Sequence, residues 1–144
     1  MSKRLFIIED DTNILYALEA QFAAEEFIVE TSNGEEDPEE IFNRLRKFSP
    51  DYVILDVILP TVDGFDILKK IKEDDELNEA RIFIFTDISD EDNKHRSLEM
   101  GADYFFFKED FDTFEFAEKV VKIVTNQDKG KREDKDEEDR DYEE

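Results

Sequence analysis

The sequence predicts an α/β protein with a doubly wound parallel sheet and the repeat (βα)₅. Short apolar runs rich in β-branched and aromatic residues alternate along the chain with longer segments of helical spacing. The apolar runs are continuous, which is typical of strands that helices cover on both faces. The 144 residues are enough for one domain with a substantial core.

Five segments have the character of buried strands. Each is a short apolar run, bounded by acidic residues or by a turn signal such as Asn33-Gly34. The predicted strands are RLFIIE (4–9), FIVETS (27–32), DYVILD (51–56), RIFIFT (81–86) and DYFFFK (103–108). With right-handed crossovers, the flavodoxin-like order 2-1-3-4-5 is one of the two common doubly wound solutions.

Helices are predicted between and after these strands. They cover 13–26, a segment opened by Asp37 as N-cap and Pro38, then 65–76, 89–101 and 111–124. In the fourth helix we expect Ser89 as the N-cap and Gly101 just past the end. In the fifth helix the spacing predicts a core-facing stripe of Phe114, Ala117, Val121 and Val124.

The composition changes near Thr125. Residues 126–144 contain one aromatic residue, no aliphatic residue, ten acids and five bases. Such a segment buries too little apolar surface to offset its ordering entropy. We therefore predict a folded domain at 1–125 and a disordered acidic tail at 126–144, with an extension of the preceding helix as the alternative.

The composition also excludes several classes of protein. A net charge of −23 argues against direct nucleic acid binding, which needs clustered basic residues. No apolar run approaches the roughly 18 residues of a membrane span, and the start MSKRLFIIEDD is too short in apolar residues for a signal peptide. There is no cysteine, which excludes disulfides. We expect a cytoplasmic protein without membrane insertion.

Polar side chains stand where the predicted strands end. Glu9 and Asp10 end the first strand, Asp56 the third, Thr86 the fourth and Lys108 the fifth. In doubly wound sheets, ligands bind at this carboxyl edge. If the first and third strands are neighbours, three carboxylates share one pocket and repel one another, which calls for a cation. Carboxylate oxygens suit Mg²⁺.

The same edge suits a phosphoryl group. Lys108 would add a positive charge and Thr86 a hydroxyl donor around the reactive carboxylate of Asp56. An ionised carboxylate is already a nucleophile and needs no general base. Taken singly, each residue also has a structural explanation, as a cap, a surface charge or the end of a strand. The hypothesis rests on all of them meeting at one edge.

Three segments resemble the receiver domain of response regulators from two-component signalling. They are LFIIEDD (5–11), PDYVILDVILPTVDGFDIL (50–68) and GADYFFFK (101–108), and the resemblance extends over residues 4–124. It implies the flavodoxin-like fold with strand order 2-1-3-4-5. It also implies that Asp56 is the phosphoacceptor. Asp10 and Asp56 would ligate Mg²⁺ with the Ile58 carbonyl, and Glu9 would act mainly through a water molecule.

The resemblance further implies a switch. Thr86 would donate to the phosphoryl oxygen, Lys108 would pair with it, and Phe105 would turn inward when Thr86 moves. Three positions depart from the family pattern. Asp87 stands where a small residue is usual and would oppose phosphorylation unless it points to solvent. Glu109 replaces the usual Pro, and Phe105 lacks the hydroxyl of the frequent Tyr.

We therefore expect a stand-alone receiver that is not an enzyme acting on other substrates. It would take phosphate from a sensor histidine kinase or a phosphotransfer protein, with Mg²⁺, and signal through contact with a downstream protein. Asp87 and Glu109 motivate an alternative, a protein interaction module that works without phosphorylation. A third hypothesis is an aspartyl-phosphate hydrolase, but such chemistry wants a second acid two residues after the nucleophile, where Ile58 stands.

Overall fold

The computed structural model describes residues 3–88 and 90–128. Strands and helices alternate along this part of the chain, as the sequence predicts. Their bounds are β1 Lys3–Ile8, α1 Thr12–Ala24, β2 Phe27–Ser32, α2 Pro38–Phe48, β3 Tyr52–Leu55, α3 Gly64–Glu73, β4 Arg81–Thr86, α4 Glu91–Glu99, β5 Tyr104–Phe107 and α5 Thr113–Asp128.

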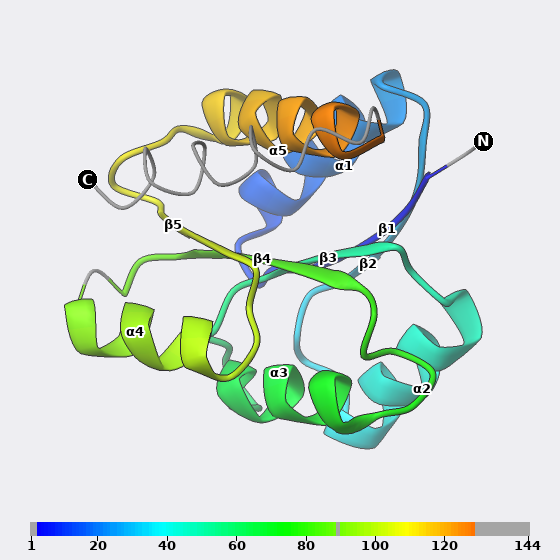
Figure 1. Cartoon of the computed structure of the whole chain (residues 1–144), viewed down its shortest axis with the longest axis vertical. Helices are drawn as coiled ribbons and strands as arrows, with labels where there is room; N and C mark the ends of the chain where they lie inside the picture. The colour runs from blue at the N-terminus through cyan, green and yellow to red at the C-terminus, as the bar shows by residue number, and fades with distance from the viewer. Residues whose placement is uncertain (1–2, 89, 129–144) are drawn as a thin grey trace.

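The strands form one parallel sheet in the order β2-β1-β3-β4-β5, which confirms the predicted flavodoxin-like topology. Helices α1 and α5 cover one face of the sheet, and α2, α3 and α4 cover the other (Figure 1). The strand order reverses between β1 and β3. The carboxyl ends of these two strands therefore lie side by side, where ligands bind in sheets of this kind.

The register of the sheet aligns the strand ends. Ile8 pairs with Leu55, and Leu55 pairs with Ile84. The next residues of β1 and β3 are Glu9 and Asp56, so their side chains leave the sheet at the same height. The Asp56 N–H donates to the Ile8 carbonyl at 3.0 Å and continues the ladder by one step.

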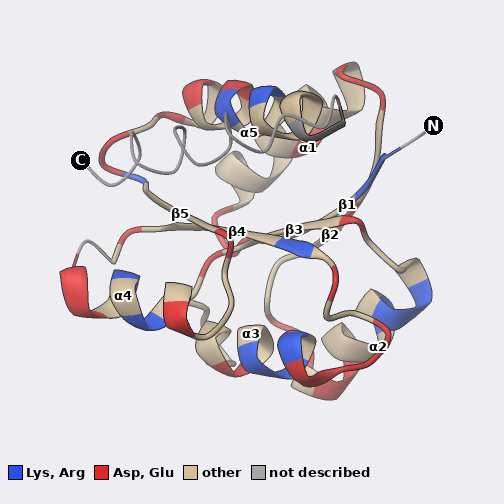
Figure 2. Cartoon of the chain, viewed as in Figure 1, with Lys and Arg blue, Asp and Glu red and all other residues tan. Residues whose placement is uncertain are grey.

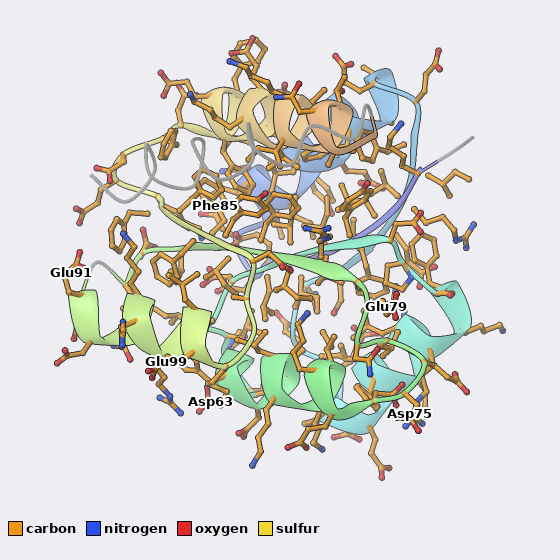
Figure 3. All side chains as sticks on the ribbon, viewed as in Figure 1. Asp63, Asp75, Glu79, Phe85, Glu91 and Glu99 are labelled. Atoms are coloured by element: carbon orange, nitrogen blue, oxygen red, sulfur yellow. The ribbon has the colours of Figure 1, made fainter. Side chains whose placement is uncertain are left out.

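The core has two halves with different compositions. Under α2, α3 and α4 it is mainly aliphatic, whereas under α1 and α5 it is rich in aromatic rings. On the aromatic side, Phe83 stacks on Tyr104 with centroids 4.9 Å apart, and Phe85 stacks on Phe116 at 3.9 Å. Figure 3 shows Phe85 between the sheet and the α1–α5 layer. Burying each ring contributes about 1.5–3 kcal/mol.

The predicted stripe on α5 is wrong at Phe114. This ring is 56% exposed, while Phe116 is fully buried. The helix carries apolar residues at two overlapping spacings, and only one set can face the sheet. Phe116 stacks on Phe85 and also packs edge-to-face on Phe106, with the two ring centroids 5.1 Å apart. Two positions along a helix turn the side chain by about 200°, so Phe114 points away from the core.

The predicted N-cap of α4 is also corrected. Asp90 is the N-cap, and its carboxylate accepts from the N–H groups of Asp92 and Asn93. Ser89 lies outside the described residues. Asp and Ser are equally good caps, so composition alone does not choose between adjacent candidates. Gly101 follows the helix with φ of 111°, a left-handed conformation that favours glycine.

Helix α5 continues through Asp128, three residues beyond the predicted domain boundary at 125. The remainder of the predicted tail, 129–144, lies outside the described residues. Within the described ranges, no helix combines the length and the apolar character that a bilayer crossing requires.

Candidate active site

The sequence-predicted residues Glu9, Asp10, Asp56, Thr86 and Lys108 come together at the carboxyl edge of the sheet. They come from the ends of β1, β3, β4 and β5, which are neighbours in the sheet. The backbone fixes their positions, because the Glu9 N–H donates to the Ser32 carbonyl at 3.1 Å and the Lys108 N–H donates to the Thr86 carbonyl at 2.8 Å. The side chains therefore stand on a rigid frame.

Three carboxylates form an acidic cluster. One oxygen from each of Glu9, Asp10 and Asp56 lies within 4.8 Å of the other two. Glu9 and Asp56 are 1% and 3% exposed, and Asp10 is exposed. Burial, together with the charge of Asp56, raises the pKa of Glu9 from 4.5 to about 7. Glu9 therefore titrates near neutral pH, because burial and the neighbouring carboxylate both oppose its ionisation.

Lys108 supplies a cation to the two buried carboxylates. Its Nζ lies 2.8 Å from Asp56 Oδ2 and 3.0 Å from the Glu9 carboxylate. Burial by itself lowers the pKa of Lys108. The hydrogen bond to Asp56 and the charges of Glu9 and Asp56 outweigh this effect and hold the pKa above 10.5. Lys108 is therefore charged at neutral pH.

Both oxygens of Asp56 are oriented by donors. Oδ1 accepts from the Ile58 N–H at 2.9 Å and from the Thr86 hydroxyl at 2.8 Å, and Oδ2 accepts from Lys108. These hydrogen bonds limit the rotation of the carboxylate. Asp56 is thus a buried carboxylate held in a fixed orientation, which is the positioning that a nucleophile needs.

Gly64 shapes the segment that follows Asp56. The chain turns back after β3 through a bridge between Ile58 and Asp63, and the Gly64 N–H donates to the Val57 carbonyl at 3.2 Å. A Cβ atom at Gly64 would lie 2.3 Å from the Val57 Cα. Only glycine allows α3 to begin this close to the backbone of the site.

The three departures from the family pattern have definite positions. Asp87 is exposed, so its carboxylate is solvated at the surface. The peptide bond between Lys108 and Glu109 is trans, and a turn closes when the Asp110 N–H donates to the Phe107 carbonyl at 3.1 Å. Lys108 still reaches the pocket from this turn. Phe105 is 4% exposed and packs edge-to-face on Phe107 at 5.1 Å, so its ring already points inward.

Sequence reasoning missed two contributors to the site. The Ile58 N–H is a donor to Asp56, whereas the sequence suggested only the Ile58 carbonyl as a metal ligand. The ring of Phe85 lies 5.8 Å from the Lys108 ammonium. Such a ring excludes water from the ammonium group, and the electron-rich face of the ring attracts the positive charge. The alternation of side chains along β4 places Phe85 and Thr86 on opposite faces of the sheet but does not reveal this contact.

The donor set fits a hard divalent cation. Three clustered carboxylate oxygens, with one carboxylate exposed to solvent, match the preference of Mg²⁺ for oxygen ligands and retained water. Burial and the charge of Asp56 raise the pKa of Glu9 even though Lys108 lowers it. The pocket is therefore compatible with Mg²⁺ binding.

Comparison with known proteins gives the same family that the sequence motifs resemble. A model of the response regulator receiver domain family matches residues 5–120. The transcriptional regulatory protein AfsQ1 of Streptomyces coelicolor is 36% identical over 104 residues, which are 72% of this chain and 44% of that protein. The matched segments span between 25% and 44% of the curated relatives.

Solved structures match over most of the chain. A putative response regulator from Chloroflexus aurantiacus has a TM-score of 0.73 and 26% identity, and the match covers 87% of this chain and 99% of that one. The BeF3-activated receiver domain of DrrB, a Thermotoga maritima protein, has a TM-score of 0.72, 26% identity and the same coverage.

A parallel (βα)₅ sheet with an acidic pocket and a lysine at its carboxyl edge defines a receiver domain. The chain belongs to the response regulator receiver domain family of two-component systems. This family consists of signalling phosphoacceptor domains, and its members are not enzymes acting on separate substrates.

Proposed function

We propose that this receiver accepts a phosphoryl group on Asp56 from a histidine kinase or a phosphotransfer protein, and that it then signals through contact with a downstream protein. The observation that carries the proposal is the state of Asp56. Its carboxylate is 3% exposed, lies beside Glu9 and Asp10, and accepts from Thr86 and Lys108.

The transfer needs no base. An oxygen of the Asp56 carboxylate attacks the phosphorus of a phosphohistidine, and an O–P bond forms as the N–P bond breaks. The electron pair of the N–P bond stays on the imidazole nitrogen, which takes a proton from solvent. Lys108 and Thr86 donate hydrogen bonds to Asp56 in the unphosphorylated protein. After transfer they would donate to the phosphoryl oxygens and stabilise the negative charge that develops there.

The same residues would support release of the phosphate. Water attacks the phosphorus, the O–P bond to Asp56 breaks, and inorganic phosphate leaves as the carboxylate is restored. Glu9, Asp10 and Asp56 would hold Mg²⁺, together with the Ile58 carbonyl. When bound, the ion supplies positive charge to the phosphoryl oxygens. The domain would thus promote only its own phosphorylation and dephosphorylation.

Phe105 is the proposed switch residue. Phe105 lies in β5 and pairs with Ile84 of β4. Ile84 precedes Thr86 by two residues in the same strand. A shift of the Thr86 hydroxyl toward a phosphoryl group would change the packing between these strands and α4. Since Phe105 is already inward, we propose that phosphorylation stabilises this packing and does not create it.

We further propose that the receiver acts in the cytoplasm. Residues 126–144 are themselves acidic and almost without apolar residues, a composition that does not suit contact with DNA. The alternative is an interaction module that works without phosphorylation. Asp87 was one reason for this alternative, and its exposed position weakens that reason.

Intact mass spectrometry after incubation with acetyl phosphate and Mg²⁺ tests the proposal. We expect the wild-type chain to gain one phosphoryl group and Asp56→Asn to gain none, while Asp51→Asn, an exposed aspartate at the other end of β3, behaves as wild type. If folded wild-type protein stays unlabelled, phosphate acceptance is wrong. Equal binding of a downstream partner by wild type and Asp56→Asn would favour the alternative.

Beryllofluoride provides an independent test, since the DrrB receiver carries it in its activated form. With Mg²⁺ it should shift the amide resonances of Thr86, Lys108 and α4 in wild type and leave those of Asp56→Asn unchanged. Shifts of equal size in both proteins would contradict a role for Asp56.

A further inference from the structure

A groove of about 650 Å³ lies between α1 and α5. Its apolar part includes Phe111, Phe114 and Val121, and its far end is lined by Gln21 and Glu25 at the end of α1. Phe114 is 56% exposed although it is an aromatic residue on a helix that packs on the sheet. No residue of the acidic pocket lines the groove, although Asp110 and Phe111 follow Lys108 by only two and three positions.

The floor of the groove is rigid. Phe111 packs edge-to-face on Phe106 at 5.2 Å, and Phe106 contacts Phe116, which stacks on Phe85. These rings belong to the aromatic half of the core, so Phe111 is held from below. A preformed apolar surface loses little entropy when it binds a partner. The groove therefore presents the exposed Phe114 beside a fixed ring.

The rim of the groove is acidic. Its lining includes the acids Glu25, Asp110, Glu115 and Glu118, and the bases Lys119 and Lys122. Figure 2 shows acidic and basic segments along α5, with acids also in the loop that precedes it. The whole chain carries a charge of −23, which adds a long-range attraction for cations. A complementary ligand is apolar along one side and positively charged around it.

We propose that this groove docks a basic amphipathic helix of a protein partner, with an apolar side chain of that helix against Phe114. Helices bind grooves through apolar residues spaced at i, i+3, i+4 and i+7, which suits a trough between two helices. Nucleic acids and anionic membranes share the charge of the groove and are repelled. A second copy of this chain carries the same −23, and residues 129–144 carry nine acids against five bases.

The proposal goes beyond phosphate acceptance and does not depend on it. The test uses the full chain and a synthetic helical peptide of about 15 residues, with leucines at the spacing above and lysines elsewhere. A scrambled peptide of the same composition is the control, and affinity is measured by fluorescence anisotropy at physiological salt, which screens non-specific attraction between charges. We expect binding of the amphipathic peptide to be at least tenfold tighter than that of the scrambled one.

Two variants and their matched controls locate the site. Phe114→Ser should weaken peptide binding roughly tenfold. Tyr16→Ser also removes an exposed aromatic ring, but from α1 and outside the groove, and should leave peptide binding unchanged. Glu118→Lys should weaken binding roughly fivefold, whereas Glu73→Lys on α3, across the sheet, should not (Figure 1). Asp56→Asn should bind as tightly as wild type, so failure here is distinct from failure of phosphate acceptance.

Several results would overturn the proposal. Equal affinity of wild type and Phe114→Ser would place the peptide elsewhere. A mass in solution that falls from dimer to monomer on Phe114→Ser would make a second copy the occupant. A shift in the amide resonances of residues 129–144 when Phe114→Ser is made in the free protein would make that segment the occupant.

Discussion

The Thr86 hydroxyl donates to Asp56 Oδ1 at 2.8 Å, and both side chains are buried at the ends of neighbouring strands. Thr86→Val keeps the shape of the side chain but leaves Asp56 without this donor. We expect the free energy of unfolding in urea to fall by about 1–2 kcal/mol, because a buried charged acceptor loses a partner.

Thr86→Ser is the matched control for this change, since it keeps the hydroxyl and loses only a methyl group. The free energy of unfolding of Thr86→Ser should fall by less than that of Thr86→Val, and Thr86→Ser should keep the response to beryllofluoride. If Thr86→Ser were the more destabilised of the two, methyl packing and not the hydrogen bond would be the main role of Thr86.

Lys108→Met removes the cation between Glu9 and Asp56. Breaking a buried pair in this way leaves charges uncompensated, and we expect a loss of about 3 kcal/mol at pH 7 without Mg²⁺. Urea unfolding measures the loss. Asp56→Asn in the same chain should recover part of it, since one of the two repelling carboxylates is then neutral.

Lys69→Met is the control for Lys108→Met, because Lys69 is exposed on α3. It should change the free energy of unfolding by no more than about 0.5 kcal/mol. A loss at Lys108 no greater than at Lys69 would mean that the pocket tolerates its acids without the ammonium group.

The pKa of Glu9 predicts a dependence of stability on pH. Glu9 has a pKa of about 7 in the folded protein and an ordinary value of 4.5. Between these values the folded chain holds a proton that the unfolded chain has lost, so this contribution to stability falls as pH rises from about 4.5 to 7. The full difference corresponds to about 3 kcal/mol.

Comparison with Glu9→Gln isolates this effect from other carboxylates. From pH 4.5 to 8, without Mg²⁺, wild type should lose about 2–3 kcal/mol of unfolding free energy relative to Glu9→Gln. Lys108 adds nothing to this slope. Its pKa is raised, so its contribution is complete below pH 10.5 and is lost only above it. Parallel curves for the two proteins would contradict a raised pKa at Glu9.

Gly64→Ala tests the close approach of α3 to the site. The added Cβ would lie 2.3 Å from the Val57 Cα, so the backbone next to Asp56 must move. We expect a loss of about 1–3 kcal/mol in urea unfolding and a weaker response to beryllofluoride. Asp66→Ala, at an exposed position in the same turn of the helix, should leave both close to wild type.

Much of the fold could be predicted because the strands are continuous apolar runs and the turns carry strong signals. The bounds of β2 and β4 agree with the prediction, and the other strands and the helices differ from it by a few residues at their ends. The inward set of α5 could not be predicted from spacing, since Phe114 and Phe116 both belong to plausible stripes. Packing against Phe85 decides between them, and that contact joins residues far apart in the sequence.

The site follows a similar division. The residue types at the strand ends, with the strand order, were enough to bring Glu9, Asp56 and Lys108 together. The burial that raises the pKa of Glu9 depends on the whole packed edge and has no signal in the local sequence. Whether these residues perform the roles that the family resemblance implies remains a prediction for the experiments above.

The ammonium group of Lys108 meets the Glu9 carboxylate across 99 positions of the chain. A ribosome must therefore deliver nearly the entire domain before the pocket can close, and a nascent or frayed chain that lacks β5 has no completed centre. The pocket proposed to accept phosphate is thus complete only when synthesis and folding are both essentially finished.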